Sequence, residues 1–140
     1  MLVARSSGES RGRERSLANH DEVVGWARER WPGDVVEHGG DGTFAEQMRV
    51  LGRAAGLLGP HGAGLAGMVA MRAGSGVAEA VPEAGVNRLN MCFAALAHAL
   101  GHRYWAVRAP GFDSQGVGAL PLASLAALPM WEWAREAAAG

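Results

Sequence analysis

Short apolar runs alternate with helical patterns along this chain of 140 residues, and this alternation restricts its fold more than any other feature. The predicted strands share a run of apolar residues that ends at a turn: 2–4, 35–36, 57–58, 77–81 and 104–107. Strands that alternate with helices are typical of a parallel sheet covered on both faces. We therefore predict one α/β domain over residues 1–140.

Two of the predicted helices begin with the spacing of a capping box. Asn19 and Glu22 are three residues apart, as are Thr43 and Glu46. In a capping box, the N-cap side chain and the acid each bond a backbone N–H of the other residue. An apolar face is predicted to follow the second box, from residues at helical spacing: Phe44, Met48, Leu51 and Ala55.

Charge and composition exclude several classes of function. The net charge is −1 and no basic face is evident, so we expect no nucleic-acid partner. Cys92 is the single cysteine, which excludes an intrachain disulfide and a cysteine-based metal site. No stretch reaches the roughly 20 apolar residues that cross a bilayer, and the start of the chain does not resemble a signal peptide.

The segment from Leu57 to Met71 (LLGPHGAGLAGMVAM) reads as a strand, a glycine-rich turn and a short helix over Leu65–Met71. In open α/β sheets, ligands bind where a strand passes into a helix, and the helix start favours an anion. Gly62 and Gly64 would let the backbone approach a phosphate, and His61 can donate to one. Taken alone, the segment is equally consistent with a tight turn whose glycines serve packing.

Residues 59–65 (GPHGAGL) resemble the signature of glycosyltransferase family 61, which includes plant xylan pentosyltransferases and animal transferases of N-acetylglucosamine to EGF domains. Flanking pieces resemble the family in the same order, over about Leu2 to Val107: Val3-Ala4-Arg5, Arg15 with Asn19, Phe44-Ala45-Glu46-Gln47, Val77-Ala78-Glu79 with Pro82, and Cys92-Phe93 through Gly101-His102-Arg103-Tyr104. Gly67 departs from the family, which often has Asn there.

The resemblance implies a Rossmann-like domain that forms the C-terminal half of a GT-B enzyme. Such a half holds the nucleotide-sugar donor, and we expect the N-terminal, acceptor-side domain to be absent from this chain. The implied activity is inverting transfer of N-acetylglucosamine or a pentose from a UDP-sugar to a glycoprotein or polysaccharide. The resemblance also implies the lumen of the Golgi or endoplasmic reticulum.

Site roles follow from the resemblance, residue by residue. Arg5 and Arg15 are expected to neutralise the donor diphosphate as it departs, and His61 with the turn Gly62-Ala63-Gly64 to bind it. Glu79, expected at the end of its strand, would accept the ribose hydroxyls. For Arg5, Arg15 and Glu79 the alternative is an ordinary ion pair with a neighbouring charged residue. Gln47 is expected to support the site indirectly.

The general base of an inverting transfer is expected outside this chain, with His61 a weak candidate. No carboxylate pair suggests a metal, and we expect no cofactor besides the donor. Trp131 and Trp133 indicate either a packed terminal helix or, in a GT-B enzyme, a helix that crosses to the other domain and leaves both exposed. A nucleotide-binding remnant without activity and an unrelated Rossmann-like protein remain alternative hypotheses.

Overall fold

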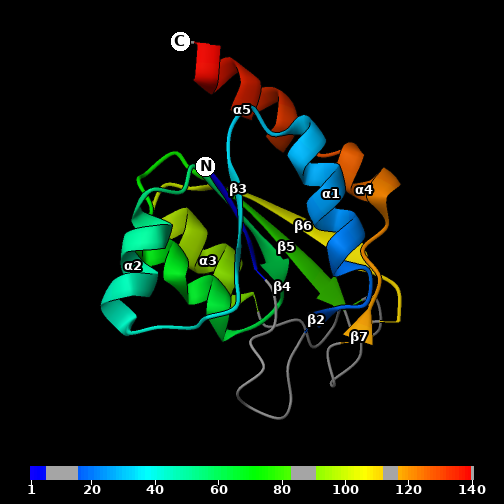
Figure 1. Cartoon of the computed structure of the whole chain (residues 1–140), viewed down its shortest axis with the longest axis horizontal. Helices are drawn as coiled ribbons and strands as arrows, with labels where there is room; N and C mark the ends of the chain where they lie inside the picture. Colours follow the sequence, from blue (N-terminus) through cyan, green and yellow to red (C-terminus); the bar gives the residue numbers. More distant parts are fainter. Residues whose placement is uncertain (6–15, 83–90, 112–116, 140) are drawn as a thin grey trace.

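A computed structural model describes residues 1–5, 16–82, 91–111 and 117–139. Its centre is a sheet of five parallel strands in the spatial order β3-β1-β4-β5-β6 (Figure 1). These strands are β1 (Leu2–Arg5), β3 (Val35–His38), β4 (Gly56–Pro60), β5 (Gly76–Pro82) and β6 (Arg103–Ala109). All five strands predicted from the sequence are confirmed, and the parallel pairing confirms the α/β class.

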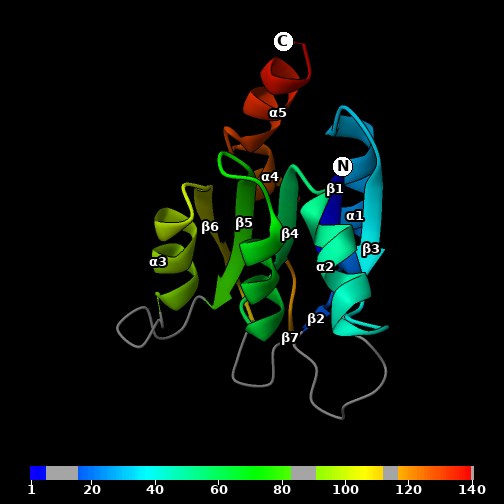
Figure 2. The same cartoon turned by 90° about the vertical axis from the view of Figure 1, so that its left-hand side faces the viewer.

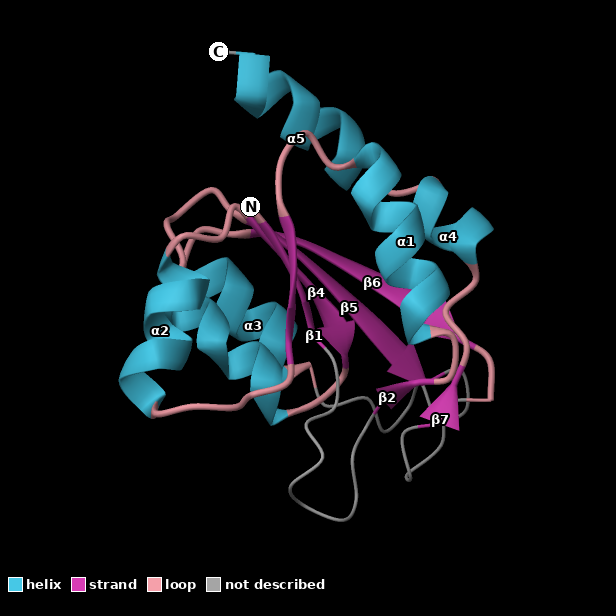
Figure 3. Cartoon of the chain, viewed as in Figure 1, coloured by secondary structure: helices cyan, strands magenta, loops and turns pink. Residues whose placement is uncertain are grey.

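Helices cover both faces of the sheet (Figure 3). One face carries α1 (His20–Arg30), α4 (Leu122–Ala126) and α5 (Met130–Ala139). The other face carries α2 (Phe44–Gly52), the 3₁₀ helix η1 (Ala63–Ala70) and α3 (Cys92–Ala99). Figure 2 shows η1, in green, between α2 and α3. A small parallel pair joins β2 (Ser16–Leu17) to β7 (Val117–Gly118).

Side chains of successive strand residues enter two separate cores, because a strand alternates its faces. Leu57 packs with the core under α2, η1 and α3, whereas Leu58 packs with the core under α1, α4 and α5. Val77 and Ala78 divide in the same way. The period-two pattern hidden in these continuous apolar runs therefore builds a three-layer domain.

The strand order creates a switch point between β1 and β4. From β1 the chain passes through α1 to β3 on one side, and from β4 it passes through η1 to β5 on the other. These two connections lead in opposite directions, so the loops after β1 and β4 separate there. Ligands of open α/β sheets bind at this position, beyond the carboxyl ends of the strands.

Only one of the two predicted capping boxes forms. Thr43 and Glu46 exchange both bonds, with Thr43 N–H donating to Glu46 at 2.7 Å and Glu46 N–H to Thr43 Oγ1 at 3.3 Å. The box predicted at Asn19 is wrong, because its side chain makes no cap bond to the helix. Instead Asn19 Nδ2 donates to Leu120 O at 2.9 Å and its Oδ1 accepts from Leu120 N–H at 2.8 Å.

The apolar face predicted for α2 is correct at its centre and wrong at its ends. Leu51 is buried and Met48 packs against the core, but Ala55 is exposed and Phe44 is 75% exposed. Phe44 is the first residue of α2, and Ala55 lies beyond its last residue, Gly52. Helical spacing identifies a face and does not tell how far along the helix that face is covered.

The terminal helix packs on the domain, so the first of the two alternatives for Trp131 and Trp133, a packed terminal helix, is the one that the structure shows. Trp131 is buried, lies edge-on to Trp26 at 4.8 Å between ring centroids, and donates its Nε1–H to Leu125 O at 2.7 Å. Trp133 is half-buried against Trp31 and Trp105. The tryptophans thus fasten α5 to α1 and to the sheet.

Candidate functional site

The loop after β4 leads directly into η1 at the switch-point edge of the sheet. His61 N–H donates to Ala80 O at 2.8 Å and continues the ladder between β4 and β5. Leu65 N–H is bonded to Gly62 O at 2.9 Å, the first turn of a 3₁₀ helix. The N–H groups of Ala63 and Gly64 precede that bond, in the turn where a helix leaves its donors without intrahelical acceptors. Their placement gives the loop donors for an anion.

The helix of this motif differs from the prediction in start and in type. It begins at Ala63 rather than Leu65, and it is a 3₁₀ helix over its whole length. Close packing accompanies this geometry, because a Cβ added at Gly67 would lie 2.3 Å from Leu51 Cδ1. Gly67, the departure from the family pattern, therefore lets η1 approach α2 closely.

Glu79 lies in the middle of β5, not at its end, and is almost fully buried. Its neighbours across the sheet are Gly59 on β4 and Ala106 on β6. One carboxylate oxygen, Oε1, is hydrogen-bonded to Nδ1 of His61. The other, Oε2, accepts the hydroxyl of Tyr104 at 2.5 Å. Binding of ribose hydroxyls by Glu79 would require it to exchange these partners.

Tyr104 lies on β6 and closes a line of three polar side chains that we call the buried chain: His61, Glu79 and Tyr104. Burial, followed by the hydrogen bond to Glu79 and the charge of that carboxylate, raises the pKa of Tyr104 above its ordinary value. Tyr104 therefore remains a hydroxyl donor over the whole physiological range. A buried carboxylate is stable only with such donors, because desolvation alone would disfavour its charge.

The imidazole of His61 is held from a second direction by an aromatic ring. Phe93 of α3 is buried and meets the His61 ring edge-on, with 5.3 Å between the centroids. The side chain of His61 is 15% exposed, compared with 2% for Glu79. His61 therefore connects the buried carboxylate to the surface of the loop.

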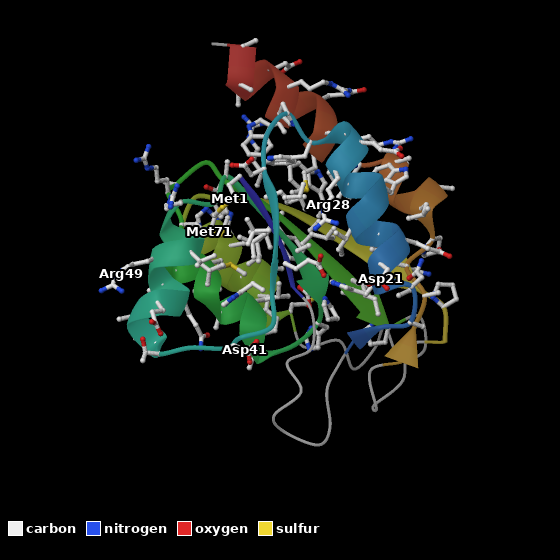
Figure 4. All side chains as sticks on the ribbon, in the orientation of Figure 1. Met1, Asp21, Arg28, Asp41, Arg49 and Met71 are labelled. Atoms are coloured by element: carbon white, nitrogen blue, oxygen red, sulfur yellow. The ribbon has the colours of Figure 1, made fainter. Side chains whose placement is uncertain are left out.

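A second glycine-rich loop borders the same edge, between β3 and α2. Gln47 Nε2 donates to Gly40 O at 2.7 Å and to Gly42 O at 3.2 Å, and both glycines have positive φ. Asp41 lies between them, beyond the carboxyl end of β3, whereas Met1 precedes the start of the neighbouring strand β1 (Figure 4). Gln47 thus fixes the shape of this loop.

The structure locates the predicted arginines only in part. The backbone of Arg5 ends β1 and pairs in register with His38, while its side chain lies outside the described part of the structure. Arg15 is outside the described residues. Of the predicted site residues, His61 and Glu79 are in contact, and residues 62–64 adjoin them.

Tyr104 and Phe93 are not among the site residues predicted from the sequence. Both belong only to the segments that resemble the closing helix and strand of the family. One signal was available, since Tyr104 is the single tyrosine of the chain and lies on a predicted strand. Its hydroxyl reaches Glu79 only because β6 is placed next to β5, which a sequence pattern does not state.

His98 and His102, which are four residues apart in the sequence, have separate surroundings. His102 is buried and its Nε2 is 3.0 Å from Met68 O, whereas His98 is exposed on α3. None of the helices in the described ranges is long and apolar enough to cross a membrane.

The fold and this edge together define a doubly wound, Rossmann-like α/β protein with a glycine-rich loop at its switch point. The family model of glycosyltransferase 61 matches residues 2–78, more than half of the chain. The chain belongs to the glycosyltransferase 61 family. The matched range includes β1, the loop at His61 and all of η1, and it ends one residue before Glu79. A comparison with curated proteins gives no match.

Proposed function

We propose that this domain binds the nucleotide-sugar donor of an inverting family 61 glycosyltransferase. The observation that carries the proposal is the position of residues 59–65, the GPHGAGL loop, at the carboxyl end of β4 beside the switch point. The family match covers this loop in full. Ligands of doubly wound sheets are bound at that edge, so family and topology support the same location.

The donor diphosphate would lie at the start of η1. The N–H groups of Ala63 and Gly64 would donate to its oxygens, and Gly62 would keep side-chain atoms out of the way. His61, at the surface end of the buried chain, would add a side-chain donor. The three interactions come from one loop, so its geometry is set by the β4–β5 ladder rather than by flexible side chains.

Arg5 and Arg15 are proposed to neutralise the diphosphate as it leaves the sugar. Arg5 ends the strand next to β4, so its backbone lies beside the loop that holds the phosphate. A guanidinium binds phosphate oxygens through paired donors and stabilises charge that develops in the transition state. Residues beyond this domain are proposed to supply the general base and the acceptor site, and the Golgi or endoplasmic reticulum lumen is the proposed location.

Calorimetric titration with UDP, UMP and uridine tests the proposal. We expect UDP to bind more tightly than UMP, and uridine to bind most weakly, because the loop recognises the diphosphate. Arg5→Ala, Arg15→Ala and His61→Ala should each weaken UDP binding by roughly tenfold or more, the value of one charge-assisted hydrogen bond. His20→Ala is the matched control, since it removes a histidine outside the loop.

A folded wild-type chain that shows equal, weak heats for all three compounds would contradict the proposal. Equal losses for His61→Ala and His20→Ala would contradict the assignment to this loop. Circular dichroism of each variant establishes that it is folded before its affinity is compared.

A further inference from the structure

We infer that Glu79 and Tyr104 are positioning residues that act through His61, and that neither touches the nucleotide. This inference rests on the proposed function for its ligand, a nucleoside diphosphate. Its structural basis is the buried chain, in which each carboxylate oxygen of Glu79 already has a partner from the protein.

The buried chain fixes which nitrogen of the His61 imidazole carries a proton. Glu79 Oε1 is an acceptor, so Nδ1 of His61 must donate to it. The other ring nitrogen, Nε2, lies on the opposite side of the ring from the buried carboxylate. In the diphosphate complex Nε2 donates to a phosphate oxygen.

The buried carboxylate stabilises the cationic ring that this arrangement requires. A carboxylate paired with imidazole both orients the ring and supports its positive charge, as partners of histidine do in other sites. Glu79 is nearly without solvent contact, so water screens this interaction little. The negative charge of Glu79 thereby acts on the phosphate through His61. In direct contact, the carboxylate would repel the phosphate.

Tyr104 holds the carboxylate in place. Its hydroxyl takes Oε2, which leaves Oε1 as the acceptor that faces His61. Phe93 limits rotation of the imidazole from the side of α3. The orientation of His61 is therefore set by β5, β6 and α3 together, and the loop that carries it need not be rigid by itself.

A double-mutant cycle on the full chain distinguishes this role from direct ribose binding. Glu79→Gln keeps the size of the side chain and removes its charge, and we expect UDP affinity to fall about tenfold. In the His61→Ala background the same substitution should change UDP affinity less than about twofold, because the residue acts through His61. Glu37→Gln, at the exposed pair with His20, should leave UDP affinity unchanged.

Additive losses in the two backgrounds would overturn the inference, since they would mean that Glu79 contacts the nucleotide directly. Tyr104→Phe gives a milder variant, with an expected loss of about threefold to tenfold in the presence of His61 and none in its absence.

Long-range ¹H–¹⁵N NMR of the protein labelled with ¹⁵N-histidine gives a readout that does not depend on UDP. The His61 signals, assigned by their loss in His61→Ala, should show a proton on Nδ1 in wild type and a changed tautomer balance in Glu79→Gln. A ligand-free ring protonated only at Nε2 would overturn the inference. Failure of UDP to bind while the Nδ1 tautomer is present would contradict the proposed function and leave the positioning role supported.

Discussion

Two glutamate–histidine pairs in the described part of the structure each connect a strand to a neighbouring segment, and they differ in burial. In the buried chain, Glu79 is 2% exposed and is shared between His61 and Tyr104. In the second group, which we call the surface cluster, Glu37 is 41% exposed and is shared between His20 at 3.2 Å and Arg28 at 3.0 Å. Both groups pair a glutamate with a histidine, so any difference in their behaviour comes from their surroundings.

The third partner separates the two groups chemically. Tyr104 donates a neutral hydroxyl, so the carboxylate charge of the buried chain remains directed at His61. Arg28 brings a full positive charge, which neutralises Glu37 without the histidine. His20, Asp21 and Glu37 place possible metal-ligand atoms close together. Glu37 is already paired with the guanidinium of Arg28, which lies on α1 with Asp21 (Figure 4). Burial with a neutral donor therefore leaves the carboxylate of Glu79 directed at His61, whereas the carboxylate of Glu37 is shared with a cation.

The largest expected contrast is the loss of each carboxylate. Glu79→Ala should lower the free energy of unfolding by about 2–5 kcal/mol, because it leaves the Tyr104 hydroxyl and the His61 ring without their acceptor in a buried position. Glu37→Ala should cost less than about 1 kcal/mol, as exposed ion pairs do. Urea unfolding of the two variants beside wild type measures both, and equal losses would mean that burial does not separate the groups.

Loss of the third partner, Tyr104 or Arg28, should lower the free energy of unfolding in the same order, by smaller amounts. Tyr104→Phe removes one hydrogen bond to a buried carboxylate and should cost about 1.5–3 kcal/mol. Arg28→Gln removes an exposed pair and should cost less than about 1 kcal/mol. The same urea curves test this, and a Tyr104→Phe variant as stable as wild type would show that the hydroxyl does not support Glu79.

Alkaline pH should reveal the hydrogen bond between Tyr104 and Glu79 in the buried chain. The pKa of Tyr104 is raised in the folded state, so above the ordinary tyrosine pKa of about 10 the unfolded chain loses a proton that the folded chain keeps. Stability should be fully present below that pH and decline as pH rises toward the folded-state pKa. The slope should stay below the one-proton limit of about 1.4 kcal/mol per pH unit, because Tyr104 is only half-buried.

Two measurements check this behaviour. Unfolding curves between pH 8 and 11 (about three units around the tyrosine pKa) should slope downward for wild type and flatten for Tyr104→Phe. Because the chain has one tyrosine, ultraviolet absorbance at alkaline pH reports Tyr104 alone. Ionisation at the ordinary tyrosine pKa in the folded protein would contradict the hydrogen bond to Glu79.

Salt should produce the smallest difference. The effect of Glu37→Gln on stability, a few tenths of a kcal/mol, should shrink as ionic strength rises, because exposed charges are screened. The effect of Glu79→Gln should change little over the same range. Thermal unfolding in low and high salt measures both effects. A destabilisation by Glu79→Gln that shrinks in high salt would mean that water reaches the buried chain.

The sequence predicted the strands and the glycine-rich loop because their signals are local. Apolar runs and turn residues define β4 and residues 59–65 without knowledge of neighbours. The predicted cap at Asn19 is wrong because the backbone of Leu120, far away in sequence, gives the Asn19 side chain both a donor and an acceptor. Local spacing cannot indicate such a competitor.

The candidate site was predictable in its loop and not in its buried chain. His61 and Glu79 were both singled out, but as two separate contacts to the donor. Their contact depends on the β4–β5 register, and Tyr104 depends on the place of β6. Family resemblance assigned residues to a site, whereas the sheet decides which of them meet.

Amide NMR during a UDP titration tests the central claim most directly. The claim is that the diphosphate binds at residues 61–64, the surface end of the buried chain. We predict that the N–H signals of Gly62, Ala63 and Gly64 shift in a saturable manner, while those of His20, Arg28 and Glu37 remain unchanged. Saturable shifts at the surface cluster with none at residues 61–64 would contradict the account.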